Sequence, residues 1–83
     1  MNHADVVAGL LKRGTRLDVA VQYADAFLEY HEASANIQAQ GAMVLHPRTA
    51  NPIENPYLKI RDRALVKLQR MTRVDSAFLW GSP

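Results

Sequence analysis

The apolar residues of the stretch 16–40 recur at helical spacing, and no Gly or Pro interrupts them. One long helix is therefore predicted here, because apolar residues three and four positions apart line one face of an α-helix. Thr15 and Asp18 have the spacing of a capping box, in which each side chain accepts a hydrogen bond from the other residue's backbone N–H. Gly41 follows the last helical residue, where a left-handed conformation commonly ends a helix.

A second helix is predicted over residues 56–73. Asn55 is a favourable N-cap, because its side-chain oxygen can accept a backbone N–H of the first turn. Pro56 would occupy the first helical position, where the missing N–H has no intrahelical partner to lose. The Asn55–Pro56 pair therefore marks the start of this helix.

The remaining segments are short. Residues 6–11 are apolar and end before Gly14, which predicts a short N-terminal helix. The linker 41–54 contains two prolines and cannot continue the first helix, and its apolar residues 43–45 suit an extended conformation. The predicted fold is all-α, a single domain of residues 1–83 with a short N-terminal helix in 1–14, a long antiparallel helical hairpin in 15–73 and a C-terminal tail in 74–83.

The long helices carry more apolar surface than a two-helix hairpin can cover. A surface helix needs one apolar stripe, whereas the first helix has nearly two. The surplus predicts a homo-oligomer in which the second stripe packs against neighbouring subunits. Alternatively, the N-terminal helix and the tail fold back to cover it. The residues predicted at the oligomer interface are Leu17, Val21, Tyr23, Ala24, Phe27, Leu28, Tyr30, Ile60, Ala64, Leu68 and Trp80.

Composition narrows the function classes. The chain has 83 residues, of which 48% are hydrophobic and 22% charged, as in a small folded domain. The absence of cysteine excludes a disulfide framework, cysteine-ligated metal sites and thiol catalysis. No apolar run reaches the length of a membrane span, and no charged segment precedes the first apolar stretch as in a secretory signal. A small intracellular protein is expected.

The sequence contains no pattern that is typical of catalysis. His3, His31 and His46 have no Cys, Asp or Glu at metal-ligand spacing, and neither a glycine-rich phosphate loop nor a nucleophile elbow occurs. The carboxylates of the first long helix are irregularly spaced and do not suggest a general acid/base pair. A function without catalytic residues, metal or cofactor is therefore expected.

Charge is segregated between the two long helices, although the net charge is only +2. Residues 18–32 contain four acidic residues and no Lys or Arg, whereas residues 57–73 contain six Lys and Arg and one Asp. These charges could pair within the hairpin or between subunits, or they could simply be solvated. A further possibility is contact between the basic helix and DNA phosphates.

The order and spacing of these features resemble a known family. The features are Gln22-Tyr23-Ala24-Asp25-Ala26 on a helix, Gly41 before an extended stretch, and Asn55-Pro56-Tyr57-Leu58 opening a helix that continues Ile60-Arg61-Asp62-Arg63-Ala64. Over about residues 10–73, the chain resembles the small terminase subunits of tailed bacteriophages, of the HK97-type group. The resemblance implies a ring-forming protein that binds viral DNA in the host cytoplasm and delivers it to the large terminase subunit, which is the ATPase and nuclease.

The basic residues of the second helix are the leading candidates for duplex DNA contact. They are Lys59, Arg63, Lys67 and Arg70, which lie at i, i+4, i+8 and i+11 on one side of that helix. The next candidates are Lys12, Arg13 and Arg16, near the start of the first long helix. An alternative function is that of a small interaction protein, which uses the same hairpin to bind a packaging or regulatory protein without touching DNA.

The tail contains two aromatic residues and a leucine in succession, Phe78-Leu79-Trp80. Such a cluster is unfavourable in water and favourable at an interface. It is predicted to be buried in the oligomer with Trp80 as the anchor. A docking peptide for a larger partner is the alternative.

Overall fold

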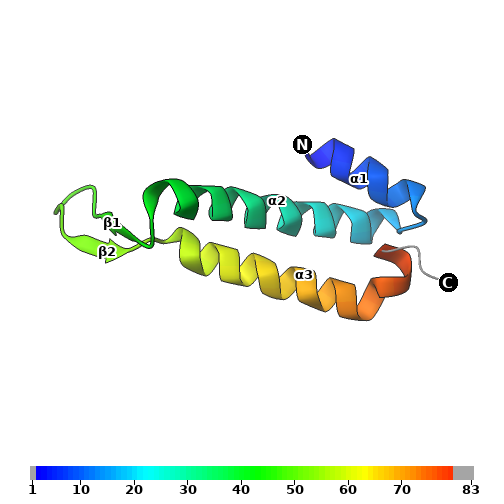
Figure 1. Cartoon of the computed structure of the whole chain (residues 1–83). Coiled ribbons are helices and arrows are strands. Elements are labelled where there is room, and N and C mark those ends of the chain that lie inside the picture. Colours follow the sequence, from blue (N-terminus) through cyan, green and yellow to red (C-terminus); the bar gives the residue numbers. More distant parts are fainter. Residues whose placement is uncertain (1, 80–83) are drawn as a thin grey trace.

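The computed structural model describes residues 2–79, with side chains described for residues 2–71. This part of the chain forms three helices and a two-stranded sheet, namely α1 (His3–Lys12), α2 (Leu17–Gln40), β1 (Met43–Leu45), β2 (Pro52–Glu54) and α3 (Tyr57–Leu79). The helices α2 and α3 lie antiparallel, α1 packs along the first half of α2, and the β-hairpin projects beyond the opposite end (Figure 1). The molecule is elongated, with extents of 52 × 23 × 18 Å. The long helical hairpin and the short N-terminal helix are thus confirmed.

The small sheet corrects the all-α prediction. The strands β1 and β2 are antiparallel, with Val44 opposite Ile53. The sequence favoured an extended conformation for residues 43–45, but it did not reveal a partner strand. Three residues are too few to show the alternation of apolar and polar side chains by which strands are recognised.

A glycine turn joins α1 to α2. Gly14 has a φ of 90°, which a residue with a Cβ rarely adopts. The N–H of Gly14 donates to the carbonyl of Leu11 at 3.0 Å, and the N–H of Thr15 donates to the carbonyl of Leu10 at 3.1 Å. These two hydrogen bonds form a Schellman motif, so α1 ends at the glycine that the sequence indicated.

The capping box predicted for Thr15 and Asp18 is wrong. The cap residue of α2 is Arg16, which makes no side-chain capping hydrogen bond. The Thr15 N–H, which the Asp18 carboxylate would have to bind, donates to Leu10 instead. The carboxylate Oδ1 of Asp18 lies 3.6 Å from Nε of Arg16. The tight turn that ends α1 therefore determines where α2 begins.

The start of α3 follows the prediction, but its end does not. The N–H of Tyr57 donates to Oδ1 of Asn55 at 3.0 Å, which confirms Asn55 as the N-cap. The helix continues to Leu79 instead of ending near residue 73. No Gly or Pro occurs between Pro56 and Gly81, so the sequence contains no residue that would stop the helix earlier.

Alanines allow the helices to pack closely. Ala20, Ala24, Ala33 and Ala64 have no exposed surface, and a methyl side chain permits a short distance between helix backbones. The core lies where α1 meets α2, with α3 beside it. It consists of Leu10, Val19, Ala20 and Tyr23, packed against Val6, Val7, Phe27, Leu68 and Met71. The helix α1 therefore covers part of the surplus apolar surface of α2, including Val19 and Tyr23. The alternative in which the chain covers its own second stripe anticipated this for the N-terminal helix.

Candidate nucleic-acid interface

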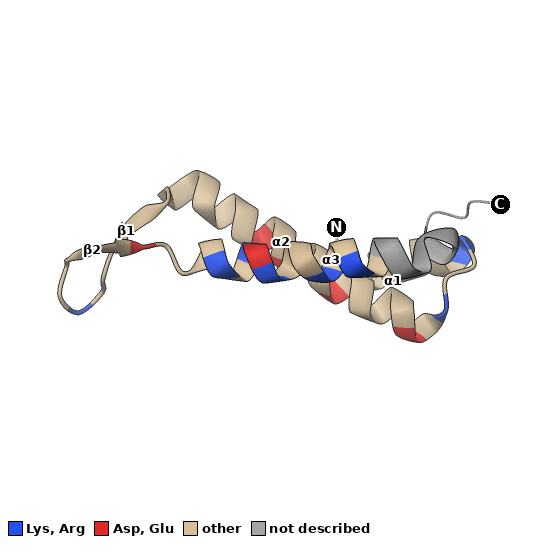
Figure 2. Cartoon of the chain, turned by 90° about the horizontal axis from the view of Figure 1, so that it is seen from below, with Lys and Arg blue, Asp and Glu red and all other residues tan. Residues whose placement is uncertain are grey.

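Four basic residues form a stripe on the outer side of α3. The basic stripe consists of Lys59, Arg63, Lys67 and Arg70, all of which are exposed. The buried side of the same helix carries Ala64 and the half-buried Ile60, Leu68 and Met71. Figure 2 shows Lys and Arg positions recurring along α3. These four cations thus lie on a side of the helix that is separate from its packing residues.

Two shallow depressions follow the basic stripe and share Arg63. One, of about 380 Å³, lies at the start of α3 and is lined by Glu54, Asn55, Pro56, Lys59, Ile60 and Arg63. The other, of about 360 Å³, is lined by Asp62, Arg63, Val66, Lys67 and Arg70. Because Arg63 belongs to both, the four basic residues border one continuous surface.

Within residues 2–71, no carboxylate neutralises the charges of the basic stripe. Among the side chains of residues 2–71, no carboxylate lies within 4.0 Å of the charged groups of these four residues. The neighbouring Arg61 differs, because it is half-buried on another side of α3 and its Nε lies 4.0 Å from Oδ1 of Asp62. Arg61 is not part of the basic stripe.

The acidic residues of α2 do not pair with the basic stripe. Asp18, Asp25 and Glu32 are exposed at seven-residue intervals, and Glu29 is half-buried. Oδ1 of Asp25 lies 2.7 Å from Nε2 of His3, so this carboxylate links α2 to α1. Within residues 2–71, no ion pair joins α2 to α3. Of the interpretations of the segregated charge, pairing within the hairpin therefore finds no support in this part of the chain.

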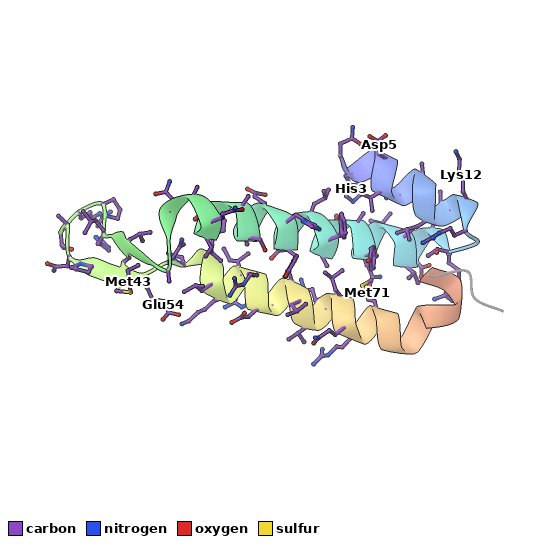
Figure 3. All side chains as sticks on the ribbon, viewed as in Figure 1. His3, Asp5, Lys12, Met43, Glu54 and Met71 are labelled. Carbon is purple, nitrogen blue, oxygen red and sulfur yellow. The ribbon has the colours of Figure 1, made fainter. Side chains whose placement is uncertain are left out.

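The second group of basic candidates lies at the turn between α1 and α2. Lys12, Arg13 and Arg16 are exposed there, and Arg16 approaches Asp18. This turn precedes α2 and the β-hairpin follows α2, so the two lie at opposite ends of the molecule (Figure 3). The three residues follow one another through a turn, so they do not form a stripe along one helix.

The residues predicted at an oligomer interface differ in their exposure. Ala24 and Ala64 are 0% exposed and Tyr23 is 9% exposed, because they pack within the chain. Leu17 is 61% exposed, and Trp80 lies outside the described residues. The others are half-buried, namely Val21, Phe27, Leu28, Tyr30, Ile60 and Leu68.

Several exposed apolar side chains were not among the predicted interface residues. These are Leu11, Met43, Leu45, Leu65 and Val66. On α3, the exposure of Leu65 and Val66 could be inferred only from the pattern of apolar residues. This pattern does not distinguish residues at the edge of the buried face of a helix from residues at its centre. In the linker, the apolar stretch 43–45 predicted an extended conformation but not an exposed apolar surface.

A comparison with protein families shows to which family the chain belongs. The family model for the small subunit of phage terminase matches residues 5–74, which include most of α1, all of α2 and the β-hairpin, and most of α3. The chain belongs to the phage terminase small subunit family. Comparison with curated proteins and with solved structures gave no significant match. The family assignment supports a role of this small terminase in phage DNA packaging.

The Asn-Pro sequence that contributed to the resemblance has a clear structural role in this small terminase. Asn55 is only 2% exposed, and its Nδ2 donates to Oδ1 of Asn36 at 3.0 Å and to the carbonyl of Gly41 at 2.9 Å. Its backbone N–H donates to the carbonyl of Ala42 at 2.8 Å. Asn55 therefore joins the end of α2, the base of the β-hairpin and the start of α3. Of these roles, only the capping of α3 was predictable from the sequence.

Other kinds of site find no support within the described part of this small terminase. No helix there combines the length and apolarity that a membrane span requires. No three residues among its His, Asp and Glu gather as metal ligands. The basic stripe is thus the feature of the described surface that most clearly suits a charged partner.

Proposed function

We propose that this small terminase assembles into a homo-oligomeric ring, binds viral duplex DNA through the basic stripe, and recruits the large terminase subunit. The observation that carries the DNA-binding part is the exposure of four cations on one side of α3 without an acidic partner among the described side chains. In this proposal the protein belongs to the HK97-type group, acts in the cytoplasm of the bacterial host and catalyses no reaction itself.

The dimensions of the basic stripe suit a DNA strand. Lys59 and Arg70 are eleven residues apart, which corresponds to about 16 Å along a helix axis at about 1.5 Å per residue. The same length equals the rise of about five base pairs at about 3.4 Å each. The four cations of one subunit can therefore reach phosphates within about five base pairs of a duplex.

Assembly would compensate for the small charge of each subunit. A chain with a net charge of +2 has little long-range attraction for DNA. Several copies that present their basic stripes to the same duplex bind with a much higher combined affinity, provided that the geometry permits simultaneous contact. The exposed Leu17 and the half-buried apolar residues of α2 and α3 are the proposed contacts between subunits. Trp80 is the proposed anchor of the tail in the same assembly.

The experiment that tests the DNA-binding part is charge reversal on and off the basic stripe. The double variant Lys67→Glu/Arg70→Glu is expected to lose most of its affinity for duplex DNA in a gel-shift assay. Arg48→Glu at the exposed tip of the β-hairpin is the control for a change of charge elsewhere, and it is compared with Lys67→Glu alone. Unchanged binding by the double variant would remove the basic stripe from the proposal.

The interaction-protein alternative predicts a different pattern. In that case the wild-type protein would bind neither cognate nor random duplexes, yet it would retain the large terminase subunit in a pull-down. Native mass spectrometry tests the assembly separately. A closed ring supports the packaging proposal, whereas a stable 9 kDa monomer at micromolar concentration contradicts its oligomeric part.

A further inference from the structure

The β-hairpin has an exposed apolar face. Residues directly opposite each other in an antiparallel pair point to the same side, so Met43, Leu45, Pro52 and Glu54 share one face. Met43 is 59% exposed and Leu45 is 66% exposed, whereas Val44 and Ile53 on the other face are half-buried. Met43 and Glu54 lie side by side at the base of the hairpin (Figure 3). An isolated two-stranded hairpin is only marginally stable in water, so a partner on this hairpin would stabilise it.

The hydrogen-bond register shows which backbone groups point away from the hairpin. The N–H of His46 donates to Asn51, and the N–H of Asn55 donates to Ala42. In an antiparallel pair, hydrogen-bonded residues alternate with residues whose N–H and C=O groups point outward. Met43 and Leu45 occupy the outward positions of β1. Each of them therefore presents one donor and one acceptor along the outer edge of that strand.

The outer edge of β2 is different because Pro52 occupies one of its outward positions. Proline has no backbone N–H, so this edge lacks a donor that a further strand would need. Proline at an edge is a common device against strand addition. Only β1 can therefore accept another strand with a full set of hydrogen bonds.

This asymmetry indicates which partner can use the edge. Hairpins of adjacent subunits in a ring would have to pair head to tail, with β1 of one copy beside β2 of the next, and Pro52 opposes that arrangement. Pairing of two β1 edges about a two-fold axis satisfies only two copies and cannot continue around a ring. In a ring, the β1 edge is thus left for a different protein.

We propose that β1 is a docking strand for an extended segment of the large terminase subunit, which adds to its outer edge by β-augmentation. Main-chain hydrogen bonds to Met43 and Leu45 would provide affinity, and alternate apolar side chains of the segment would cover the exposed face of the hairpin. This inference rests on the proposed recruitment of the large subunit and names the surface that performs it.

The test removes one outward donor without disturbing the hairpin. Leu45→Pro deletes the outward N–H at the position opposite Pro52, where no hydrogen bond to β2 is lost. Leu45→Ala is the matched control, because it removes the same side chain and keeps the N–H. Binding of the purified large terminase subunit to the full-length protein is measured by biolayer interferometry. We expect Leu45→Pro to weaken binding about tenfold more than Leu45→Ala does.

Hydrogen exchange distinguishes the possible occupants of the edge. The amides of Met43 and Leu45 should exchange rapidly in the protein alone and become protected when the large subunit is added, whereas the amide of His46 stays protected throughout and reports an intact hairpin. Equal binding by Leu45→Pro and Leu45→Ala would overturn the inference and leave recruitment in place. Failure of the wild-type protein to bind the large subunit would overturn both. Protection of Met43 and Leu45 before addition would show that a second copy occupies the edge.

Discussion

Nδ2 of Asn55 donates to Oδ1 of Asn36 across 3.0 Å, which joins the last turns of α2 to the residue that caps α3. The two residues are 19 positions apart, and the β-hairpin lies between them. The same Nδ2 group donates to the carbonyl of Gly41, which ends α2. One buried amide therefore fixes the relative positions of both long helices at the end from which the hairpin projects.

The first prediction concerns this amide. Asn55→Ala removes one capping hydrogen bond and two hydrogen bonds to half-buried partners, so it should lower the free energy of unfolding by about 2–4 kcal/mol. Asn36→Ala removes only one of these bonds and should cost about 1 kcal/mol. Urea unfolding at a single protein concentration measures both values. Equal destabilisation by the two variants would show that Asn55 is not the common link.

Some boundaries of the helices could be predicted from single residues in the sequence. Asn55 and Pro56 marked the start of α3, and Gly14 and Gly41 marked the ends of α1 and α2, because each position requires a backbone or side-chain property that few residues provide. Both glycines have positive φ angles in the structure, 90° and 88°. Local chemistry of this kind can be read without knowledge of the tertiary fold.

Features that depend on tertiary contacts could not be read in the same way. The N–H of Thr15, which the predicted capping box required, donates to the carbonyl of Leu10, because α1 ends in a tight turn there. Burial of Ala24 and Ala64 within the chain depends on how the helices pack, whereas their apolar character alone suggested an interface. The basic stripe was predicted more completely, because cations on one side of a helix stay in solvent whichever neighbours the other side has.

The second prediction compares two glycines of the N-terminal segment. At Gly14 an added Cβ would meet no atom, but the positive φ disfavours any L-residue, so Gly14→Ala should destabilise the protein by about 1 kcal/mol. Gly9 lies within α1, where an added Cβ also meets no atom. Gly9→Ala should therefore stabilise the protein by about 0.5–1 kcal/mol. Thermal unfolding should show shifts of opposite sign, and shifts of the same sign would contradict the role assigned to the turn.

The third prediction concerns alkaline pH. Burial raises the pKa of the Tyr23 phenol above its usual value of 10.0, because the buried site disfavours the charged form. The unfolded chain therefore releases this proton at a lower pH than the folded chain does, and stability is lost as the pH rises past 10. Tyr23→Phe should lose less stability between pH 8 and pH 11 than the wild-type protein in urea unfolding. Tyr57→Phe, which removes the hydroxyl of a half-buried tyrosine elsewhere, is the control. Parallel curves for the wild-type protein and Tyr23→Phe would refute the assignment.

The fourth prediction gives the number of phosphate contacts. Each cation that neutralises a phosphate contributes about 0.9 to the slope of log affinity against log salt concentration. Replacement of Lys67 by Ala should lower that slope by about 0.9 for each copy that contacts the duplex, and replacement of Arg48 by Ala should leave it unchanged. Fluorescence anisotropy of a labelled duplex over a salt series measures the slopes. If both variants change the slope equally, the contact is diffuse and is not centred on the basic stripe.

The last prediction concerns the proline that blocks β2. Pro52→Val restores an outward N–H to this edge and places a β-branched residue in the strand, which favours extended structure. The edges β1 and β2 of different copies can then pair head to tail, so the variant should form larger species as its concentration rises, which is measurable by light scattering. The double variant Leu45→Pro/Pro52→Val moves the block to β1 and should suppress these species. Suppression would show that the association of Pro52→Val requires both strand edges. Large species that persist in the double variant would show instead that added apolar surface, and not strand pairing, causes the association.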